Sequence, residues 1–292
     1  MKGIILVNAY SDNADYLYQA RRLAKEFSKF GVRAEIRKNY CGVASVAENG
    51  EIKLSETADF AVFLDKDKYV MNLMERAGIR LFNTARAIEL CDDKMLTHIA
   101  LVKKGIPMPE TIPAPLCYTP SVSLAEDYCE NVVSALGLPL VVKYSYGSLG
   151  KQVYLADTKE WLCALATELR TTPHFYQRYI AESRGKDLRV IAIGGKPVAA
   201  MIRRSNGDFR SNVALGGDCE PYSVTEEVAK IVEKASAALQ LDYCGVDLLF
   251  GKDGFLLCEV NSNAYFKGIE KATGVNVAAA YVEHILRVMQ NS

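Results

Sequence analysis

The order of hydrophobic and polar positions divides the chain into two stretches with different patterns. In residues 1–90, short apolar runs alternate with amphipathic segments, which is typical of a parallel sheet whose strands are joined by helices. The predicted elements are strand 2–8, helix 15–30, strand 32–38, strand 60–65, helix 68–77 and strand 80–82. This stretch therefore predicts a small doubly wound α/β domain. It has no G-x-G-x-x-G after its first strand, which disfavours a classical dinucleotide site.

From residue 84 onwards the pattern changes, and strands and helices alternate less strictly. A predicted helix at 91–104 and a proline-rich passage ending at Pro120 mark the boundary. The elements expected beyond it are helix 126–136, strand 140–144, strand 152–155, helix 158–169 and strands 175–181, 187–193, 197–204, 246–250 and 255–261. We expect Asp157 and Glu160 to form a capping box on helix 158–169. Paired short strands indicate antiparallel hairpins, so this part is predicted to be α+β.

The composition fits a globular protein of about two domains, because 292 residues with 50% hydrophobic content can bury a large core. The 35 Lys and Arg balance 35 Asp and Glu, which argues against a nucleic-acid or anionic-membrane partner. The eight cysteines lack a C-x-x-C or other metal spacing, and we expect reduced, mostly buried thiols. Without a signal-peptide pattern or a run of about 18 apolar residues, we expect a cytoplasmic location.

The most informative local pattern is a pair of apolar segments joined by residues 252–254, with Asp247 before the turn and Glu259 and Asn261 after it. Such a pattern predicts an antiparallel hairpin. A three-residue loop that ends at a left-handed Gly254 would set residue 251 opposite 255 and Asp247 opposite Glu259, with Asn261 on the same face. Oxygen ligands on one face suit a hard ion such as Mg²⁺.

Two alternatives to this metal site remain open. A two-residue turn at 253–254 would shift the pairing by one residue and send the carboxylates to opposite faces. An exposed hairpin face also carries acidic residues for solvation alone.

A glycine loop at 144–151 follows Lys143, which ends an apolar strand. Its glycines would let backbone N–H groups approach an anion, and the lysine adds positive charge. The loop does not match the P-loop pattern, because Gln152 stands where Ser or Thr is required and a strand follows. An unliganded hairpin tip is the alternative reading.

Two further segments offer groups that a nucleotide requires. Residues 177–180 present backbone atoms to a flat base, and Asp187, with Arg189 on the same face, presents a carboxylate to a ribose. An ordinary strand and loop would look the same. The segment 203–212 is dense in donors that match phosphate or carboxylate, although a solvated loop is the alternative. These donors are Arg203, Arg204, Arg210 and Asn212.

Six segments occur along the chain in an informative order. They are Asp93-Lys94 with the 105–109 turn beyond it, Lys143, the glycine loop, Asp187-Leu188-Arg189, Phe209-Arg210-Ser211-Asn212 and Glu259-Val260-Asn261. Together they resemble the ATP-grasp superfamily, and specifically its RimK-type carboxylate-amine ligases, over nearly the whole chain. The resemblance implies an N-terminal domain at 1–90 and an ATP-grasp domain at 91–292. The latter would divide into a central lobe with the glycine hairpin at 91–178 and a C-terminal lobe with the metal site at 179–292.

The resemblance also implies roles for individual residues. Asp247, Glu259 and Asn261 would hold two Mg²⁺ ions, for which Mn²⁺ is an alternative. Arg203, Arg210 and Lys143 would be catalytic, by stabilising the reacting groups. The implied ATP-binding set is Lys94, Lys143, Ser145, Tyr146, Gly147, Ser148, Gly150, Gln177, Arg178, Tyr179, Ile180, Asp187, Arg189, Arg203, Arg210 and Asn212.

The implied reaction joins an amino acid, with glutamate as a candidate, to a carboxylate-bearing peptide or small molecule through an acylphosphate. The sequence departs from the family pattern in having no proline shortly after Asn261 and one glycine fewer in its loop. The acceptor pocket and loop closure are therefore expected to differ. A non-ligating ATP-binding scaffold or sensor and a small-molecule kinase are the alternative functions, and a homo-oligomer is left open.

Overall fold

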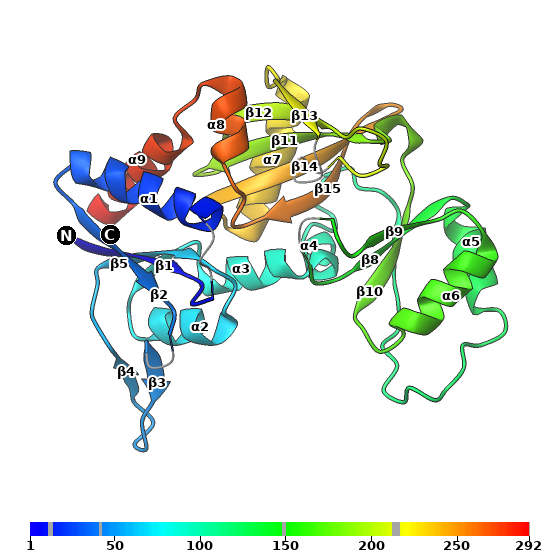
Figure 1. Cartoon of the computed structure of the whole chain (residues 1–292), viewed down its shortest axis with the longest axis horizontal. Helices are drawn as coiled ribbons and strands as arrows, with labels where there is room; N and C mark the ends of the chain where they lie inside the picture. The colour runs from blue at the N-terminus through cyan, green and yellow to red at the C-terminus, as the bar shows by residue number, and fades with distance from the viewer. Residues whose placement is uncertain (11–13, 41–42, 148–149, 212–216, 292) are drawn as a thin grey trace.

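Figure 1 shows the computed structural model, which describes every residue except 11–13, 41–42, 148–149, 212–216 and 292. In the described part of the chain, three sheets of four or five strands lie side by side, each with its own helices, and residues 44–46 and 52–54 pair as a fourth, two-stranded sheet. The N-terminal sheet is at the left of the view, the sheet covered by α5 and α6 is at the right, and the five-stranded sheet is above and between them. The fold therefore combines α/β and α+β parts, as predicted.

The N-terminal part confirms the predicted parallel sheet, whose strand order is β2-β1-β5-β6. Along β1, Ile5 packs into a cluster with α1, whereas Ile4 and Leu6 pack into another with α2, as strand alternation requires. The elements are β1 (Lys2–Val7), α1 (Ala14–Lys29), β2 (Arg33–Lys38), β3 (Ala44–Val46), β4 (Ile52–Leu54), β5 (Phe60–Leu64), α2 (Lys68–Arg76) and β6 (Arg80–Phe82).

The connection to the next lobe corrects the predicted helix 91–104. It consists of two helices, α3 (Ala85–Asp92) and α4 (Lys94–Ala100), because Asp93 leaves helical geometry with φ −94° and ψ 108°. The Asp93 carboxylate then accepts hydrogen bonds from the N–H groups of Met95 and Leu96, which caps α4. This break places Lys94 at the first position of α4.

The central lobe is an antiparallel sheet of order β7-β10-β8-β9 packed against two helices. Its elements are β7 (Thr111–Pro113), α5 (Tyr128–Leu136), β8 (Leu140–Tyr144), β9 (Val153–Ala156), α6 (Lys159–Leu169) and β10 (His174–Arg178). β10 ends at Arg178 rather than at residue 181, because the chain turns into a short 3-10 helix, η1 (Ala181–Ser183).

Two local expectations for the central lobe are wrong. Thr158, rather than Asp157, caps α6, because its backbone is extended and its hydroxyl accepts a hydrogen bond from Trp161 N–H at 3.2 Å. Cys129 and Cys163 are not free thiols but form a disulfide between α5 and α6. Sequence spacing could not reveal this pair, since packing of the two helices brings the cysteines together.

The C-terminal lobe is a five-stranded antiparallel sheet of order β13-β12-β11-β14-β15. α7 covers one face, while α8 and α9 cover the other together with α1 of the N-terminal part. The elements are β11 (Lys186–Ile193), β12 (Lys196–Arg204), β13 (Asp218–Pro221), α7 (Glu226–Leu239), β14 (Tyr243–Gly251), β15 (Gly254–Asn261), α8 (Lys267–Thr273) and α9 (Val277–Gln290). Over the residues that the structure describes, no helix has the length and apolar character needed to cross a bilayer.

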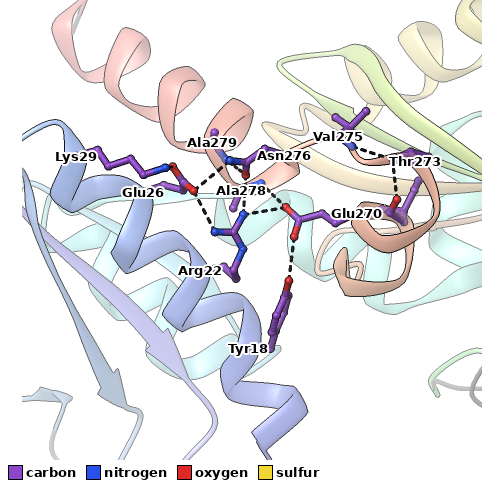
Figure 2. Close-up of polar contacts among 11 residues, drawn as sticks. Tyr18, Arg22, Glu26, Lys29, Glu270, Thr273, Val275, Asn276, Ala278 and Ala279 are labelled. Carbon is purple, nitrogen blue, oxygen red and sulfur yellow. Dashed lines mark hydrogen bonds and ion pairs between the residues drawn. The ribbon is translucent and has the colours of Figure 1, made fainter.

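Polar contacts attach the N-terminal part to this lobe. Figure 2 shows Arg22 of α1 bonded both to Glu26 on its own helix and to Asn276 at the start of α9, at 3.0 and 2.7 Å. The Tyr18 hydroxyl donates to Glu270 of α8 at 3.0 Å. On the other side of the contact, the buried Asn83 amide donates to the carbonyl oxygens of Tyr243 and Ser262. These contacts fix the N-terminal strand ends beside β15 and the start of α8.

Candidate active site

A cavity of about 1120 Å³ lies where the three parts meet, and its lining includes most of the predicted site. The predicted residues that line it are Lys94, Lys143, Tyr146, Gly147, Gly150, Gln177, Arg178, Tyr179, Ile180, Asp187, Arg189, Arg203, Arg210, Asp247, Glu259 and Asn261. Ser145 is an exception among the described members of the set, because it is buried and its backbone N–H bonds to the Pro173 carbonyl. Ser148 and Asn212 lie outside the described residues.

The β14–β15 hairpin has the predicted pairing of Asp247 with Glu259, but for a different reason. Its loop has two residues, with Gly251 opposite Gly254, so the expected three-residue loop and the pairing of 251 with 255 are wrong. A β-bulge at Cys258 then restores the register, because it leaves Leu248 opposite Leu257 but Asp247 opposite Glu259. Both carboxylates consequently share the face of the sheet that meets the cavity.

Asp247 is buried and bonded to two guanidinium groups. Arg189, its neighbour across β11 and β14, grips both carboxylate oxygens, and Arg203 Nη2 lies 3.0 Å from Asp247 Oδ2. Burial alone would raise the pKa of the Asp247 carboxyl, but Arg189 and Arg203 hold it below its usual range. Asp247 is therefore an ionised carboxylate whose negative charge is balanced within the protein.

Arg203 also bonds to Asp187, its partner across β11 and β12, with Nε 2.8 Å from Asp187 Oδ1. Burial would lower the pKa of Arg203, but the Asp247 and Asp187 carboxylates raise it. Positive and negative side chains thus alternate across three adjacent strands. A strand pattern of this kind can exchange its internal partners for phosphate and metal charges when a ligand enters.

Lys94 joins the hairpin to the glycine loop. Its ammonium lies 3.4 Å from Glu259 Oε1 and donates to the Gly147 carbonyl at 2.7 Å, while its backbone N–H bonds to the Ser145 carbonyl. The break at Asp93 is what directs Lys94 there. The loop and the predicted metal carboxylate therefore share one cation.

Lys143 lies deeper, between the central and C-terminal sheets. Its ammonium donates to Gln177 Oε1 at 2.7 Å and lies 3.4 Å from the Cys258 sulfur. Cys258 is the bulge residue. The bulge that pairs Asp247 with Glu259 therefore also places a thiol beside Lys143. Burial raises the pKa of this thiol despite the lowering effect of Lys143, so the thiol stays protonated.

Arg210 and Tyr179 complete the part of the cavity lining that contains the residues predicted to bind a nucleotide, which we call the nucleotide-facing wall. Arg210 Nη1 donates to the Gly150 carbonyl at 2.6 Å, which ties the segment after β12 to the glycine loop, and its other donors bond to Asp208. Tyr179 lines the cavity, and its hydroxyl is buried without a hydrogen-bond partner among the described residues. A buried hydroxyl without a partner is unusual, and a bound polar ligand is one way to satisfy it.

The oxygen donors on this wall fit a magnesium ion better than a softer metal. Asp247 and Glu259 supply carboxylates, and Asn261 supplies an amide whose oxygen already accepts a hydrogen bond from Asn263 N–H at 2.9 Å. Hard divalent cations prefer such oxygen sets and complete their coordination with water and phosphate. The assignment of these residues to a metal stays a prediction.

Sequence reasoning missed the part of the cavity that comes from the N-terminal domain and from the segment after β15. These lining residues are Asn8, Tyr10, Asp65, Lys66, Asn263, Tyr265 and Lys267. Asn8 and Asp65 directly follow the neighbouring parallel strands β1 and β5. Because ligands of open α/β sheets bind at the carboxyl ends of strands, this position was the signal that could have found them.

The fold is shared with ATP-grasp proteins of known structure. The D-alanine–D-alanine ligase from Bacillus anthracis, complexed with ATP, aligns with a TM-score of 0.75 and 18% identity over 100% of this chain and 99% of its own. A RimK domain ATP-grasp protein from Sphaerobacter thermophilus aligns with a TM-score of 0.71 and 17% identity over 98% and 100%. The chain thus has the ATP-grasp fold.

Sequence comparison places the chain within one branch of this fold. Residues 91–285 match the RimK-like ATP-grasp domain, and the chain belongs to this family. Human N-acetylaspartylglutamate synthase A is 34% identical over 78% of the chain and 57% of its own length, and human beta-citrylglutamate synthase B is 36% identical over 75% and 56%. A probable alpha-L-glutamate ligase from Legionella pneumophila is 34% identical over 74% and 70%. The chain therefore spans little more than half the length of the two human relatives.

Proposed function

We propose that the protein is an ATP-dependent ligase that forms an amide between a carboxylate and the amino group of an amino acid. The observation that carries the proposal is the pairing of Asp247 with Glu259 on a cavity wall that also presents Lys94, Lys143 and Arg203. Two adjacent carboxylates among so many cations suit a polyphosphate together with divalent metal ions. A purely apolar or sugar-binding pocket would have no use for this arrangement.

In this proposal ATP lies between the central and C-terminal sheets. Gln177–Ile180 face the base, Asp187 accepts a ribose hydroxyl, and Lys94 and Lys143 contact phosphates beneath the glycine loop. Two Mg²⁺ ions, held by Asp247, Glu259 and Asn261, would supply charge neutralisation at the phosphates. Arg189 and Arg203 would then give up part of their contact with Asp247 and turn to anionic groups of the reactants. The alternating charges on β11, β12 and β14 support this exchange.

The reaction has two balanced steps. A carboxylate oxygen of the first substrate attacks the γ-phosphorus of ATP, the bond to the bridging oxygen breaks, and ADP leaves. The amine then attacks the acyl carbon, inorganic phosphate leaves with the electron pair of its C–O bond, and the amine loses one proton. Lys143, Arg203 and Arg210 stabilise the transferred negative charge, so catalysis rests on positioning and electrostatics and needs no protein nucleophile.

L-Glutamate is the amine substrate that we propose. The names of three relatives support it, since they describe synthesis of N-acetylaspartylglutamate, synthesis of beta-citrylglutamate and ligation of alpha-L-glutamate. The carboxylate substrate is a peptide or a small acid. N-acetylaspartate, citrate and a peptide with a C-terminal glutamate form the first panel.

The test measures ADP and phosphate release with Mg·ATP, L-glutamate and each carboxylate in turn, together with product mass. A ligase releases phosphate only when both substrates are present, and its product lacks one water relative to the two substrates combined. Glu259→Gln should abolish this turnover. A product that retains the phosphate would establish a kinase instead. Tight Mg·ATP binding without turnover of any pair would favour a non-catalytic nucleotide-binding protein.

A further inference from the structure

The N-terminal wall of the cavity differs in charge from the nucleotide-facing wall. In the described part of the chain, four carboxylates line the cavity, and those of Asp187, Asp247 and Glu259 each form an ion pair with an arginine or lysine. Asp65 is the fourth, and no described Lys, Arg or His forms an ion pair with it. The neighbouring Lys66 ammonium bonds instead to Asp92 at 2.6 Å.

The partners of Asp65 are neutral N–H donors. Asn8 Nδ2 lies 3.3 and 3.2 Å from its two oxygens, Asn39 Nδ2 lies 2.5 Å from Oδ2, and the backbone N–H of Lys66 donates to Oδ1 at 2.8 Å. These donors hold the carboxylate in one orientation at the ends of β1 and β5, and none of them carries a positive charge. Burial raises the pKa of the Asp65 carboxyl, and these hydrogen bonds oppose that rise. A cation that approaches through the cavity would complete the set.

Asp65 is also connected to the predicted metal site. Asn263 Nδ2 donates to the Asp65 carbonyl at 2.7 Å, and the backbone N–H of Asn263 donates to Asn261 Oδ1 at 2.9 Å. Asn263 therefore bonds both to the Asp65 backbone and to Asn261, the last residue of β15. It thus links the part of the lining that contains Asp65 to the part that contains the predicted metal residues.

We infer that Asp65 binds the amino group of the incoming amino acid and is the specificity-determining residue for the amine substrate. The inference rests on the proposed ligase function and deepens it. Asn8 and Asn39 act as positioning residues, because they fix the carboxylate. The amine enters as an ammonium ion held by the carboxylate, loses one proton to solvent before its lone pair attacks the acyl carbon, and loses a second proton to solvent as the amide forms and phosphate leaves. Hydroxylamine, a small and largely uncharged nucleophile at neutral pH, would not depend on this contact.

The test compares Asp65→Asn with Asp67→Asn. The control removes the same charge two residues away, on a side chain that caps α2 outside the cavity lining, and asparagine is an equally good cap. L-Glutamate is titrated calorimetrically into each protein saturated with Mg·ADP. Asp65→Asn should weaken glutamate binding roughly 10- to 100-fold, as loss of a hydrogen bond between charged groups does. Asp67→Asn should change it less than about twofold, because the Asp67 carboxylate lies outside the cavity lining and Asn at this position keeps an acceptor for the Asn39 amide, which lies 3.2 Å away.

Two further measurements separate the possible results. Hydroxylamine in place of glutamate should be converted to hydroxamate by Asp65→Asn as by the wild type, and Asp65→Glu should restore part of the glutamate affinity. Equal glutamate binding by Asp65→Asn and Asp67→Asn would overturn the inference, as would a wild type that does not bind L-glutamate. If Asp65→Asn does not fold, Asp65→Ser, which also lacks the carboxylate, takes its place, and a glutamate affinity within twofold of the wild type would again overturn the inference.

The outcomes distinguish this inference from the proposed ligase. Asp65-dependent binding of glutamate without any turnover would support the subsite and count against ligation. Ligation of glutamate that is indifferent to Asp65→Asn would support the ligase and overturn the subsite.

Discussion

The two walls of the cavity handle charge in opposite ways. On the nucleotide-facing wall, Asp247 is held by Arg189 and Arg203, and the Asp187 and Glu259 carboxylates also form ion pairs with an arginine or a lysine. On the N-terminal wall, Asp65 is held by amides and has no cationic partner among the described residues. The first wall is prepared to exchange internal ion pairs for ligand charges, whereas the second is prepared to receive a charge that a ligand brings.

This difference determines how each wall affects the stability of the ligand-free protein. A buried carboxylate without compensation is unfavourable, and hydrogen bonds from amides reduce that penalty only in part. The nucleotide-facing wall, whose carboxylates form ion pairs, is therefore expected to stabilise the protein before any ligand binds. The N-terminal wall is expected to be stabilised only when its substrate binds.

The largest effect that would sharpen this comparison is expected from Asp247→Asn. It leaves the Arg189 guanidinium, which is 13% exposed, and the buried Arg203 without this carboxylate and should lower the free energy of unfolding by about 3–5 kcal/mol. Glu259→Gln should cost less than about 1 kcal/mol, because Glu259 is 31% exposed and Lys94 keeps its bond to Gly147. Urea denaturation without nucleotide measures both. Equal destabilisation by the two variants would show that the arginines do not depend on Asp247.

Both of these substitutions should reduce ATP-dependent turnover by roughly 100-fold or more, since each removes a carboxylate predicted to hold metal. Stability therefore reports on the ion pairs of the nucleotide-facing wall, whereas turnover reports on its predicted metal binding. A Glu259→Gln variant that retains full turnover would contradict its place in the metal site.

A second test compares two lysines near the glycine loop. Lys143→Met removes a buried ammonium from the nucleotide-facing wall and should weaken Mg·ADP binding roughly 10- to 100-fold, because a charge-assisted contact to phosphate is lost. Lys151→Met removes an exposed charge from a side chain outside the cavity lining and should change binding less than about threefold. Calorimetric titration of Mg·ADP measures both affinities. Similar losses in the two variants would indicate attraction by the general positive field rather than by contact.

Much of the nucleotide-facing wall could be predicted from the sequence, because its charged residues lie on adjacent strands that are joined by short hairpins. Residues 187–193, 197–204, 246–250 and 255–261 alternate in a way that identifies strands, and a cross-strand partner is fixed once the register is known. The predicted pairing of Asp247 with Glu259 is right only because two deviations from the expected hairpin cancel. The loop after Gly251 is one residue shorter than expected, and the bulge at Cys258 adds one residue to β15. Neither irregularity has a clear signal in the sequence.

The N-terminal wall could not be predicted, because it forms only when the N-terminal part packs against the C-terminal lobe. Asp65 and Asn263 are nearly 200 positions apart, and they meet only because the N-terminal part packs against the C-terminal lobe. The disulfide between α5 and α6 escaped prediction for the same reason. Local patterns specify strands and their neighbours, whereas contacts between lobes depend on shapes that no local pattern records.

The smallest expected effect concerns the contact that holds this second wall in place. The Glu26 carboxylate accepts hydrogen bonds from Lys29, Asn276 and Arg22 (Figure 2), and these lower its pKa from 4.5 to about 2, with the Lys29 bond the largest cause and burial opposing it. A carboxyl whose pKa is depressed on folding stabilises the protein above its unfolded pKa, and this stability is lost as the pH falls through about 2. Glu26→Gln should therefore lower the free energy of unfolding by about 1 kcal/mol at pH 7.

The difference between wild type and Glu26→Gln should shrink below pH 4.5 and vanish near pH 2, which thermal unfolding across this range measures. Mg·ADP affinity should stay unchanged, because the network lies outside the nucleotide-facing wall. Glutamate affinity is the informative quantity. If the α1 contact serves only to join the lobes, it stays constant; if the contact also positions α8 beside Asp65, it falls by a few-fold while Mg·ADP binding does not. A stability difference that grows at low pH would show that Glu26 is not ionised through these bonds, and the interface would then need another source of its strength.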